Sequence, residues 1–162
     1  MEIRTPETSD TEMINAVASK ATEILRKIYK PRQAKSDKAR STPEALTKLV
    51  ALNNRHIVGV VEYVEKNDHI YFQGLAVEPS RHRQGIARAL ITRLEKLCTE
   101  RDLQKLALAT IEETGNVQVF ERLGFGVVER EQTDQYESDL YDILHIVKMV
   151  RIVVRPVQAK QI

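Results

Sequence analysis

Cysteine is nearly absent from the sequence, because Cys98 is the single example among 162 residues. One thiol excludes an intramolecular disulfide and a zinc site built from several cysteines, so we expect no metal site. It also fits a reducing compartment, and we expect a cytoplasmic protein. Apolar runs of about 18 residues, which a membrane-spanning helix needs, are missing. The opening stretch MEIRTPETSD has no apolar core of the kind found in signal peptides. No membrane association is therefore expected.

An excess of charge of one sign is missing as well. The 25 Lys and Arg residues against 23 Asp and Glu residues leave a net charge of +2, so any anion site must come from local clustering. The basic stretch at residues 30–43 has no interleaved aromatic residues, and nucleic-acid binding is not expected. This stretch is either a solvated surface loop, with or without a short helix, or a flap that meets an anionic ligand. The length suits one domain over residues 1–162.

Hydrophobic periodicity predicts strands and helices in alternation. Helical spacing predicts helices at 10–29, opened by a capping box from Ser9 to Glu12, and at 84–101 and 115–123. Strand patterns bounded by turn residues occur at 1–4, 47–53, 56–65, 69–77, 104–111 and 125–131. Residues 143–154 also fit helical spacing, but their many β-branched residues favour a strand after a polar loop at 131–142. This order predicts a mixed α/β sheet with helices on its faces.

The stretch SRHRQGIARAL, residues 80–90, places several cations and one glycine directly before a helix. A helix N-terminus offers unpaired N–H groups and a partial positive charge, and phosphate binds there readily. Gly85 and Ala87 lack bulk, which lets an anion approach the backbone closely. Neither the P-loop nor the dinucleotide fingerprint is present. The residues alone leave two interpretations open: an anion site, or a basic loop before an ordinary helix.

Two segments together resemble one family. LAVEPSRHRQGIARAL, residues 75–90, is similar to the acetyl-CoA signature of the GNAT superfamily of N-acetyltransferases, and VFERLGF, residues 119–125, resembles a later segment of that family. The resemblance implies a single mixed α+β domain with a mostly antiparallel sheet, helices on both faces and splayed central strands at 69–77 and 104–111. It implies acetyl-CoA as cosubstrate and a primary amine of a small molecule or peptide as acceptor, attacked directly in a ternary complex. A monomer and a homodimer both agree with it.

The resemblance also implies roles in a cofactor site. Backbone groups of Leu75 and Val77 would pair with the pantetheine arm, and Gly74 would either permit the distortion of that strand or serve only in packing. Backbone N–H groups of residues 83–88 would hold the pyrophosphate, with Arg81, Arg83 or the basic stretch at 30–43 near the outer phosphate. The expected cofactor-binding residues are Leu75, Ala76, Val77, His82, Arg83, Gln84, Gly85, Ile86, Ala87, Arg88, Asn116 and Phe120.

Some positions depart from the family pattern. His82 replaces the usual Arg or Gln, and it still offers a hydrogen-bond donor. Phe120 replaces a frequent tyrosine that protonates the departing thiolate, a change that slows transfer without forbidding it. Water or a tyrosine of the 131–142 loop would then supply the proton. The family's asparagine corresponds to Glu113 without a gap, or to Asn116 with a longer loop. Phe120 also motivates an alternative function, a CoA-binding module that senses or scaffolds with little transfer.

Direct attack on the thioester needs a neutral amine, so a base must remove a proton from the alkylammonium. Glu62 is the one carboxylate inside a strongly apolar strand, and Tyr71 lies on the next strand; these two are the candidate catalytic residues. Each has a plainer alternative, an outward-facing strand residue for Glu62 and a packed aromatic for Tyr71. Cys98 lies on an apolar helix face and is expected in the core. The histidines without a supporting motif are His56, His69 and His145.

Overall fold

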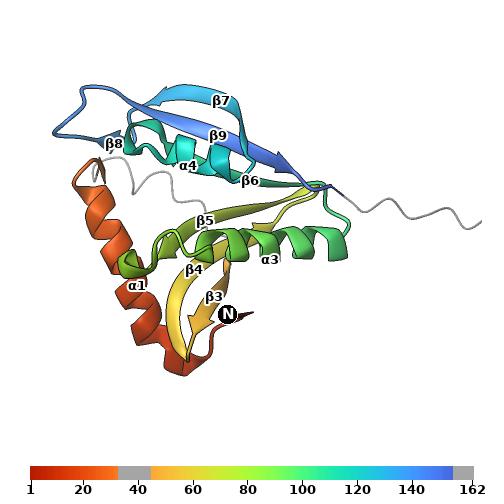
Figure 1. The fold of residues 1–162 in the computed structure, drawn as a ribbon. Coiled ribbons are helices and arrows are strands. Elements are labelled where there is room, and N and C mark those ends of the chain that lie inside the picture. The colour runs from red at the N-terminus through yellow and green to blue at the C-terminus, as the bar shows by residue number, and fades with distance from the viewer. Residues whose placement is uncertain (33–44, 155–162) are drawn as a thin grey trace, which may run out of the picture.

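A seven-stranded sheet lies at the centre of the protein, and the computed structural model describes residues 1–32 and 45–154. Its strands are β1 (Glu2–Arg4), β3 (Thr47–Asn53), β4 (His56–Glu65), β5 (His69–Val77), β6 (Lys105–Ile111), β7 (Gly126–Thr133) and β9 (Leu144–Ile152). They lie in the order β1-β3-β4-β5-β6-β9-β7 (Figure 1). Among the described strands, β5 and β6 form the one parallel pair, which confirms a mostly antiparallel sheet. Strand β9 also confirms the strand interpretation of the C-terminal segment.

Helices cover both faces of the sheet, as expected. Helix α1 (Thr11–Arg26) packs on one face, while α3 (Ile86–Glu100) and α4 (Asn116–Arg122) pack on the other (Figure 1). Short 3-10 turns precede the helices: η1 (Thr8–Asp10), η2 (Pro79–Arg81) and η3 (Glu112–Thr114). None of the helices in the described ranges is both long enough and apolar enough to cross a membrane.

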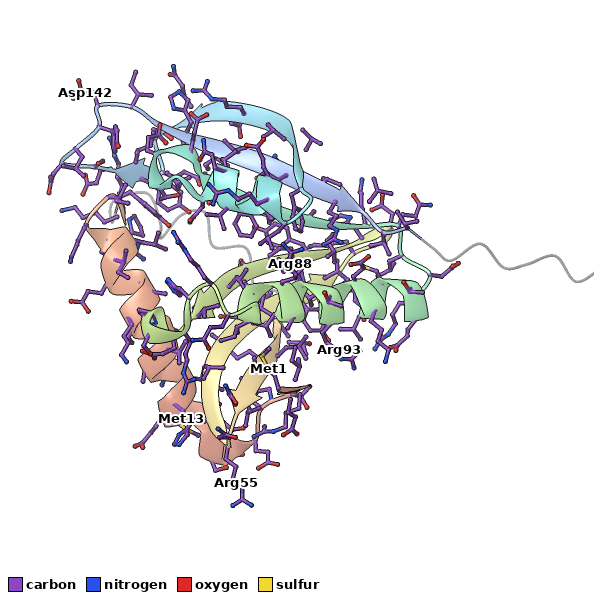
Figure 2. The ribbon with its side chains drawn as sticks, in the orientation of Figure 1. Met1, Met13, Arg55, Arg88, Arg93 and Asp142 are labelled. Atoms are coloured by element: carbon purple, nitrogen blue, oxygen red, sulfur yellow. The ribbon has the colours of Figure 1, made fainter. Side chains whose placement is uncertain are left out.

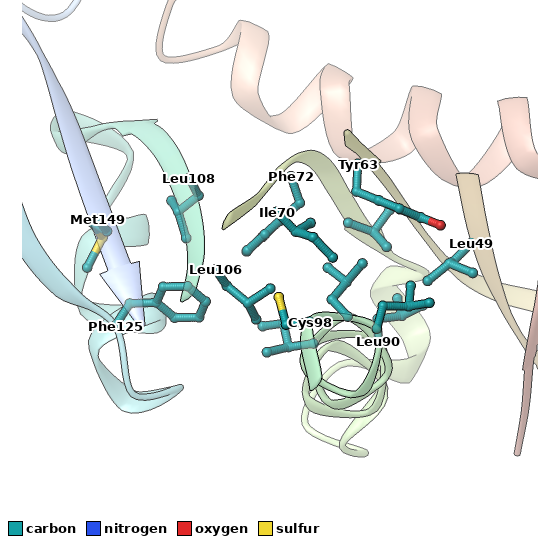
Figure 3. Packing of buried hydrophobic residues seen from close by; sticks show 14 of the residues in the cluster. Leu49, Tyr63, Ile70, Phe72, Leu90, Cys98, Leu106, Leu108, Phe125 and Met149 are labelled. Atoms are coloured by element: carbon teal, nitrogen blue, oxygen red, sulfur yellow. The ribbon is translucent and has the colours of Figure 1, made fainter. Parts of the chain in front are cut away.

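The two-residue period of the strands gives each face of the sheet its own core. On β5, Ile70 and Phe72 are buried in the cluster that also contains Leu90 of α3 (Figure 3). Burial of one such side chain contributes roughly 1.5–3 kcal/mol. Helix α3 comes closest to β4 at Gly59, where an added Cβ would lie 2.7 Å from Ile86 Cγ2. Glycine at this position therefore lets the start of α3 lie directly against the sheet.

The start of α1 differs from the prediction. Ser9 does not cap this helix, because it already lies in η1, and the helix begins at Thr11. The carboxylate that organises this turn belongs to Asp10, which accepts hydrogen bonds from the Glu7 backbone N–H and from Arg4 Nη1, both at 2.7 Å. The capping box therefore lies two residues earlier than predicted, between Glu7 and Asp10, and the ion pair with Arg4 is added to it.

The segment after α1 forms a small second sheet that the sequence did not indicate. Helix α1 ends at Arg26, and β2 (Lys30–Pro31) pairs with β8 (Tyr136–Glu137), which lies inside the predicted polar loop. Strand β7 also extends to Thr133, into the same predicted loop. Strands of two residues are too short to show a hydrophobic period, so this pairing appears only in three dimensions. Residues 33–44, which hold most of the basic stretch, lie outside the described part.

Candidate active site

The central strands β5 and β6 separate soon after they begin. They share three residue pairs, the last of which is Tyr71 with Ala107. Gly74 then forms a bulge, because its φ of +62° is left-handed and the β4–β5 register shifts between Val60 and Glu62. Beyond Tyr71, no described strand pairs with β5 on its β6 side. The splayed central strands implied by the resemblance are present.

A cleft of about 690 Å³ lies beside the free end of β5, and we call it the basic cleft. Its walls come from the end of β5, the loop and first turn of α3, and parts of α1 and α4. Arg88 reaches it from α3, on the side that faces α4 (Figure 2). The other basic side chains in its wall are Arg81, His82, Arg83 and Arg122. No Asp or Glu among the described residues lines it, so the basic cleft attracts anions.

The loop before α3 turns its backbone toward the basic cleft. Gly85 has a φ of +80°, and apart from its neighbours in the chain no described residue comes within 4 Å of the position that a Cβ would take. The N–H groups of residues 85–88 donate to no described residue, so four donors remain at the positive end of a helix dipole. His82 fastens this loop to β5, since its Nε2 lies 3.1 Å from the carbonyl oxygen of Val77. The arrangement suits a phosphate or diphosphate.

Nearly all the residues expected around the cofactor line the basic cleft. Those in its wall are Leu75, Ala76, Val77, His82, Arg83, Gly85, Ile86, Ala87, Arg88, Asn116 and Phe120. Gln84 is the exception: it is exposed and does not line the cleft. It follows Arg83, whose φ of +65° is left-handed. The expectation that Gln84 contacts the cofactor therefore depends on its backbone N–H alone.

A second cavity, of about 300 Å³, lies between β5 and β6 beyond their last pair, and we call it the tyrosine pocket. Tyr71 reaches it from β5, Tyr136 from β8, and Tyr29 from the segment after α1. The rings of Tyr29 and Tyr136 meet edge to face with their centroids 5.3 Å apart. Burial raises the pKa of Tyr29 and of Tyr71, so both hydroxyls stay protonated at neutral pH.

The two cavities adjoin. Four side chains line both of them: Leu25, Leu75, Asn116 and Phe120. One end of a long anionic ligand bound in the basic cleft would therefore lie next to a molecule bound in the tyrosine pocket. Such an arrangement brings two substrates together at the split of the sheet.

A family model agrees with this geometry. The model of the acetyltransferase (GNAT) family matches residues 13–125, which is most of the chain. This chain belongs to the acetyltransferase (GNAT) family. The matched region contains the β5 bulge, the loop before α3 and the whole of α4, so it includes all the described residues that line the basic cleft. No protein with a curated description matches the sequence.

Solved structures of the same fold are distant in sequence from this GNAT protein. A protein from Streptococcus mutans superposes with a TM-score of 0.74 at 20% identity, over 95% of this chain and 100% of that one. An aminoglycoside 6'-N-acetyltransferase complexed with coenzyme A gives 0.67 at 16% identity, over 98% and 100%. A ribosomal-protein-alanine N-acetyltransferase from Brucella melitensis gives 0.67 at 15% identity, over 94% and 99%. At these identities the likeness shows the fold and leaves the acceptor open.

Phe120 and Asn116 occupy the junction of the two cavities in this GNAT-family protein. The Phe120 ring packs edge to face against Phe72 and Phe125, with centroid distances of 6.2 and 5.8 Å. It offers no proton to a leaving thiolate. Asn116 opens α4 and lines both cavities, whereas Glu113 lines neither. Of the two positions considered for the family's asparagine, Asn116 is the one that faces the site.

The two candidate catalytic residues lie on one face of the sheet. Tyr71 lines the tyrosine pocket, and Gln73, two residues further along β5, pairs with Glu62 of β4. Glu62 is half-buried, and its Oε1 lies 3.4 Å from the Cβ position at Gly74, which is part of the pocket wall. In the described part of the chain, no hydrogen bond or ion pair occupies the Glu62 carboxylate. It remains available as an acceptor at the edge of the pocket.

Two adjacent glutamates at the end of β6 meet a histidine at the start of β9, and all three are potential metal ligands. Ligand atoms of Glu112, Glu113 and His145 lie within 4.8 Å of one another. His145 Nδ1 lies 2.6 Å from Glu113 Oε1, so His145 has a partner that the sequence did not indicate. Arg130 donates hydrogen bonds to both Glu112 oxygens and holds the pKa of that carboxyl below its usual range. These groups form an ion-pair network in which Arg130 offsets the charge of Glu112, and Glu113 holds His145.

Cys98 takes no part in either cavity. It is fully buried on the core side of α3, which confirms the expected core thiol. Burial raises the pKa of its thiol to about 11. A protonated, enclosed thiol is a poor nucleophile, so the geometry offers no route through an acetyl-cysteine intermediate.

Proposed function

We propose that this protein is an acetyl-CoA-dependent N-acetyltransferase, in which a primary amine attacks the thioester directly within a ternary complex. The observation that carries the proposal is the meeting of the basic cleft and the tyrosine pocket at the β5–β6 split. The basic cleft supplies cations and free N–H groups, which a CoA diphosphate needs. The tyrosine pocket supplies room for a second molecule. The coenzyme A complex of an aminoglycoside acetyltransferase with this fold supports the choice of cofactor.

The pantetheine arm would lie along the free edge of β5 as an added strand. The carbonyl of Val77 already accepts a hydrogen bond from His82, so the arm pairs with the remaining backbone groups of residues 75–77. The pyrophosphate would accept hydrogen bonds from the N–H groups of residues 85–88. Arg81 and Arg83 stand nearest in sequence to this loop and would face the outer phosphate.

The acetyl transfer would need two proton transfers and one nucleophilic attack. The acceptor ammonium gives one proton to Glu62, through the Tyr71 hydroxyl or through water, and the amine nitrogen attacks the thioester carbonyl carbon. The C–N bond forms, the C–S bond breaks, and the second nitrogen proton goes to the CoA thiolate. Tyr71 would hold the amine and pass the first proton toward Glu62. A thiolate is a tolerable leaving group near neutral pH, as the cysteine thiol pKa of about 8.5 illustrates, which makes transfer feasible with Phe120 in place of a tyrosine.

Release of free CoA thiol, measured with acetyl-CoA and a panel of primary amines, tests this function. Direct transfer predicts amine-dependent release and initial-velocity lines that intersect when both substrates are varied. Parallel lines would instead indicate an acetyl-enzyme. Phe120 favours the alternative, a CoA-binding module without efficient transfer. Tight acetyl-CoA binding with no release on any amine would replace the proposal with that alternative.

A further inference from the structure

The tyrosine pocket has a neutral wall. None of the sixteen described residues that line it carries a charge at neutral pH. Its polar groups are the three tyrosine hydroxyls and the side chains of Gln73, Thr110, Thr114 and Asn116. A molecule in this pocket therefore meets aromatic rings and neutral hydrogen-bonding groups, and it finds no carboxylate ring of the kind that would balance several ammonium groups.

The three tyrosines form the aromatic side of the pocket. The rings of Tyr29 and Tyr136 pack against each other with their centroids 5.3 Å apart, and the β2–β8 pairing holds the two segments together. Tyr71 reaches the pocket from β5. Rings arranged in this way bind another ring edge to face or offset, and they also attract a single ammonium group. The pocket thus favours a ligand that has one ring and one amine.

The charges around the pocket act against a second ammonium. The Arg26 guanidinium lies 5.6 Å from the centroid of the Tyr29 ring. The cation Lys148 is close enough to Tyr71 to oppose the effect of burial on its pKa, although Lys148 forms an ion pair with Glu129 at 3.2 Å. Among the described residues, the Glu62 carboxylate lies just outside the lining of the pocket, beside the wall residue Gly74. One ammonium has a partner there, and a second would meet positive charge.

We propose that the acceptor is a small monoamine that carries an aromatic ring and no second positive charge. Polyamines and polycationic aminosugars are then poor substrates. The volume of about 300 Å³ agrees with this, because it lies at the small end of the range for ligand pockets, roughly 300–1,000 Å³. This inference rests on the proposed function and narrows its acceptor.

The test compares kcat/KM for 2-phenylethylamine, butylamine and spermidine, each with saturating acetyl-CoA. We expect 2-phenylethylamine to exceed butylamine about tenfold, since ring contacts of this kind contribute roughly threefold to tenfold each. Spermidine should rank lowest. Tyr136→Ala should remove most of the preference for the ring, while Tyr136→Phe should keep it. Tyr141→Ala is the matched control, because Tyr141 is exposed and lies outside both cavities.

Two outcomes would overturn the inference. One is a higher kcat/KM for spermidine than for 2-phenylethylamine, which leaves the transferase function intact. The other is a ring preference that survives Tyr136→Ala. If no amine is acetylated, titration of 2-phenylethylamine into the CoA-loaded protein decides the matter separately. If 2-phenylethylamine binds and Tyr136→Ala weakens that binding, the pocket is selective for the ring and only the transferase function is rejected. If 2-phenylethylamine does not bind, the inference is rejected.

Discussion

The rings of Phe120 and Phe72 meet edge to face, with centroids 6.2 Å apart, where the basic cleft adjoins the tyrosine pocket. A hydroxyl on the first of these rings would stand near the leaving sulfur. We expect Phe120→Tyr to raise kcat, by up to roughly a hundredfold, because general acid assistance has about that value. The KM for acetyl-CoA should change little. Steady-state kinetics checks this, and a variant with a lower kcat would contradict the placement of the thioester.

Glu62 is expected to act as the base, so Glu62→Gln should lower kcat/KM at neutral pH by roughly a hundredfold. The loss should shrink as the pH rises, since the free amine then forms without the enzyme's help. Glu23→Gln serves as the control, because Glu23 is exposed on α1 and lines neither cavity. The measurement is a pH profile of kcat/KM. Profiles that coincide for the variant and the wild type would remove Glu62 from the mechanism.

Cys98 should resist thiol reagents in the folded protein. Its burial and its pKa of about 11 leave almost no accessible thiolate at mildly alkaline pH. We expect a disulfide reagent to label it only as fast as the protein unfolds, and rapidly in denaturant. The measurement is the rate of absorbance change on labelling, compared between the folded protein and the protein in denaturant. Fast labelling without denaturant would mean that α3 opens locally or that the thiol is exposed.

The ion pair of Asp10 with Arg4 predicts a pH-dependent stability. The hydrogen bond from Arg4 is the main cause that holds the pKa of Asp10 below its usual range, and the Glu7 N–H adds to it. A lowered carboxyl pKa contributes stability above the unfolded-state pKa, about 3.9, and this stability is lost as the pH falls through the folded-state pKa. Asp10→Asn should therefore lower the urea midpoint at neutral pH, and the difference should vanish in strong acid. A difference that stays constant would contradict this cause.

Local sequence patterns predicted the central strands well. β3, β4 and β5 begin and end where the sequence places them, because polar turn residues separate three apolar segments. The same holds for the basic cleft, whose loop residues are contiguous in the sequence. The tyrosine pocket is different, since Tyr29 and Tyr136 come from distant segments that the β2–β8 pairing joins. Nothing in the sequence near Tyr29 indicates that pairing.

Titration of acetyl-CoA into three proteins, the wild type and two variants of Gly85, tests the cofactor site most directly. Gly85→Asn and Gly85→Asp introduce side chains of nearly equal size. Asn and Asp both adopt a positive φ, here +80°, more readily than most residues do. They differ by one negative charge beside the expected pyrophosphate. We predict that Gly85→Asp binds at least about tenfold more weakly than Gly85→Asn, a difference of about 1.4 kcal/mol. Equal affinity in all three proteins would show that this loop does not hold the cofactor.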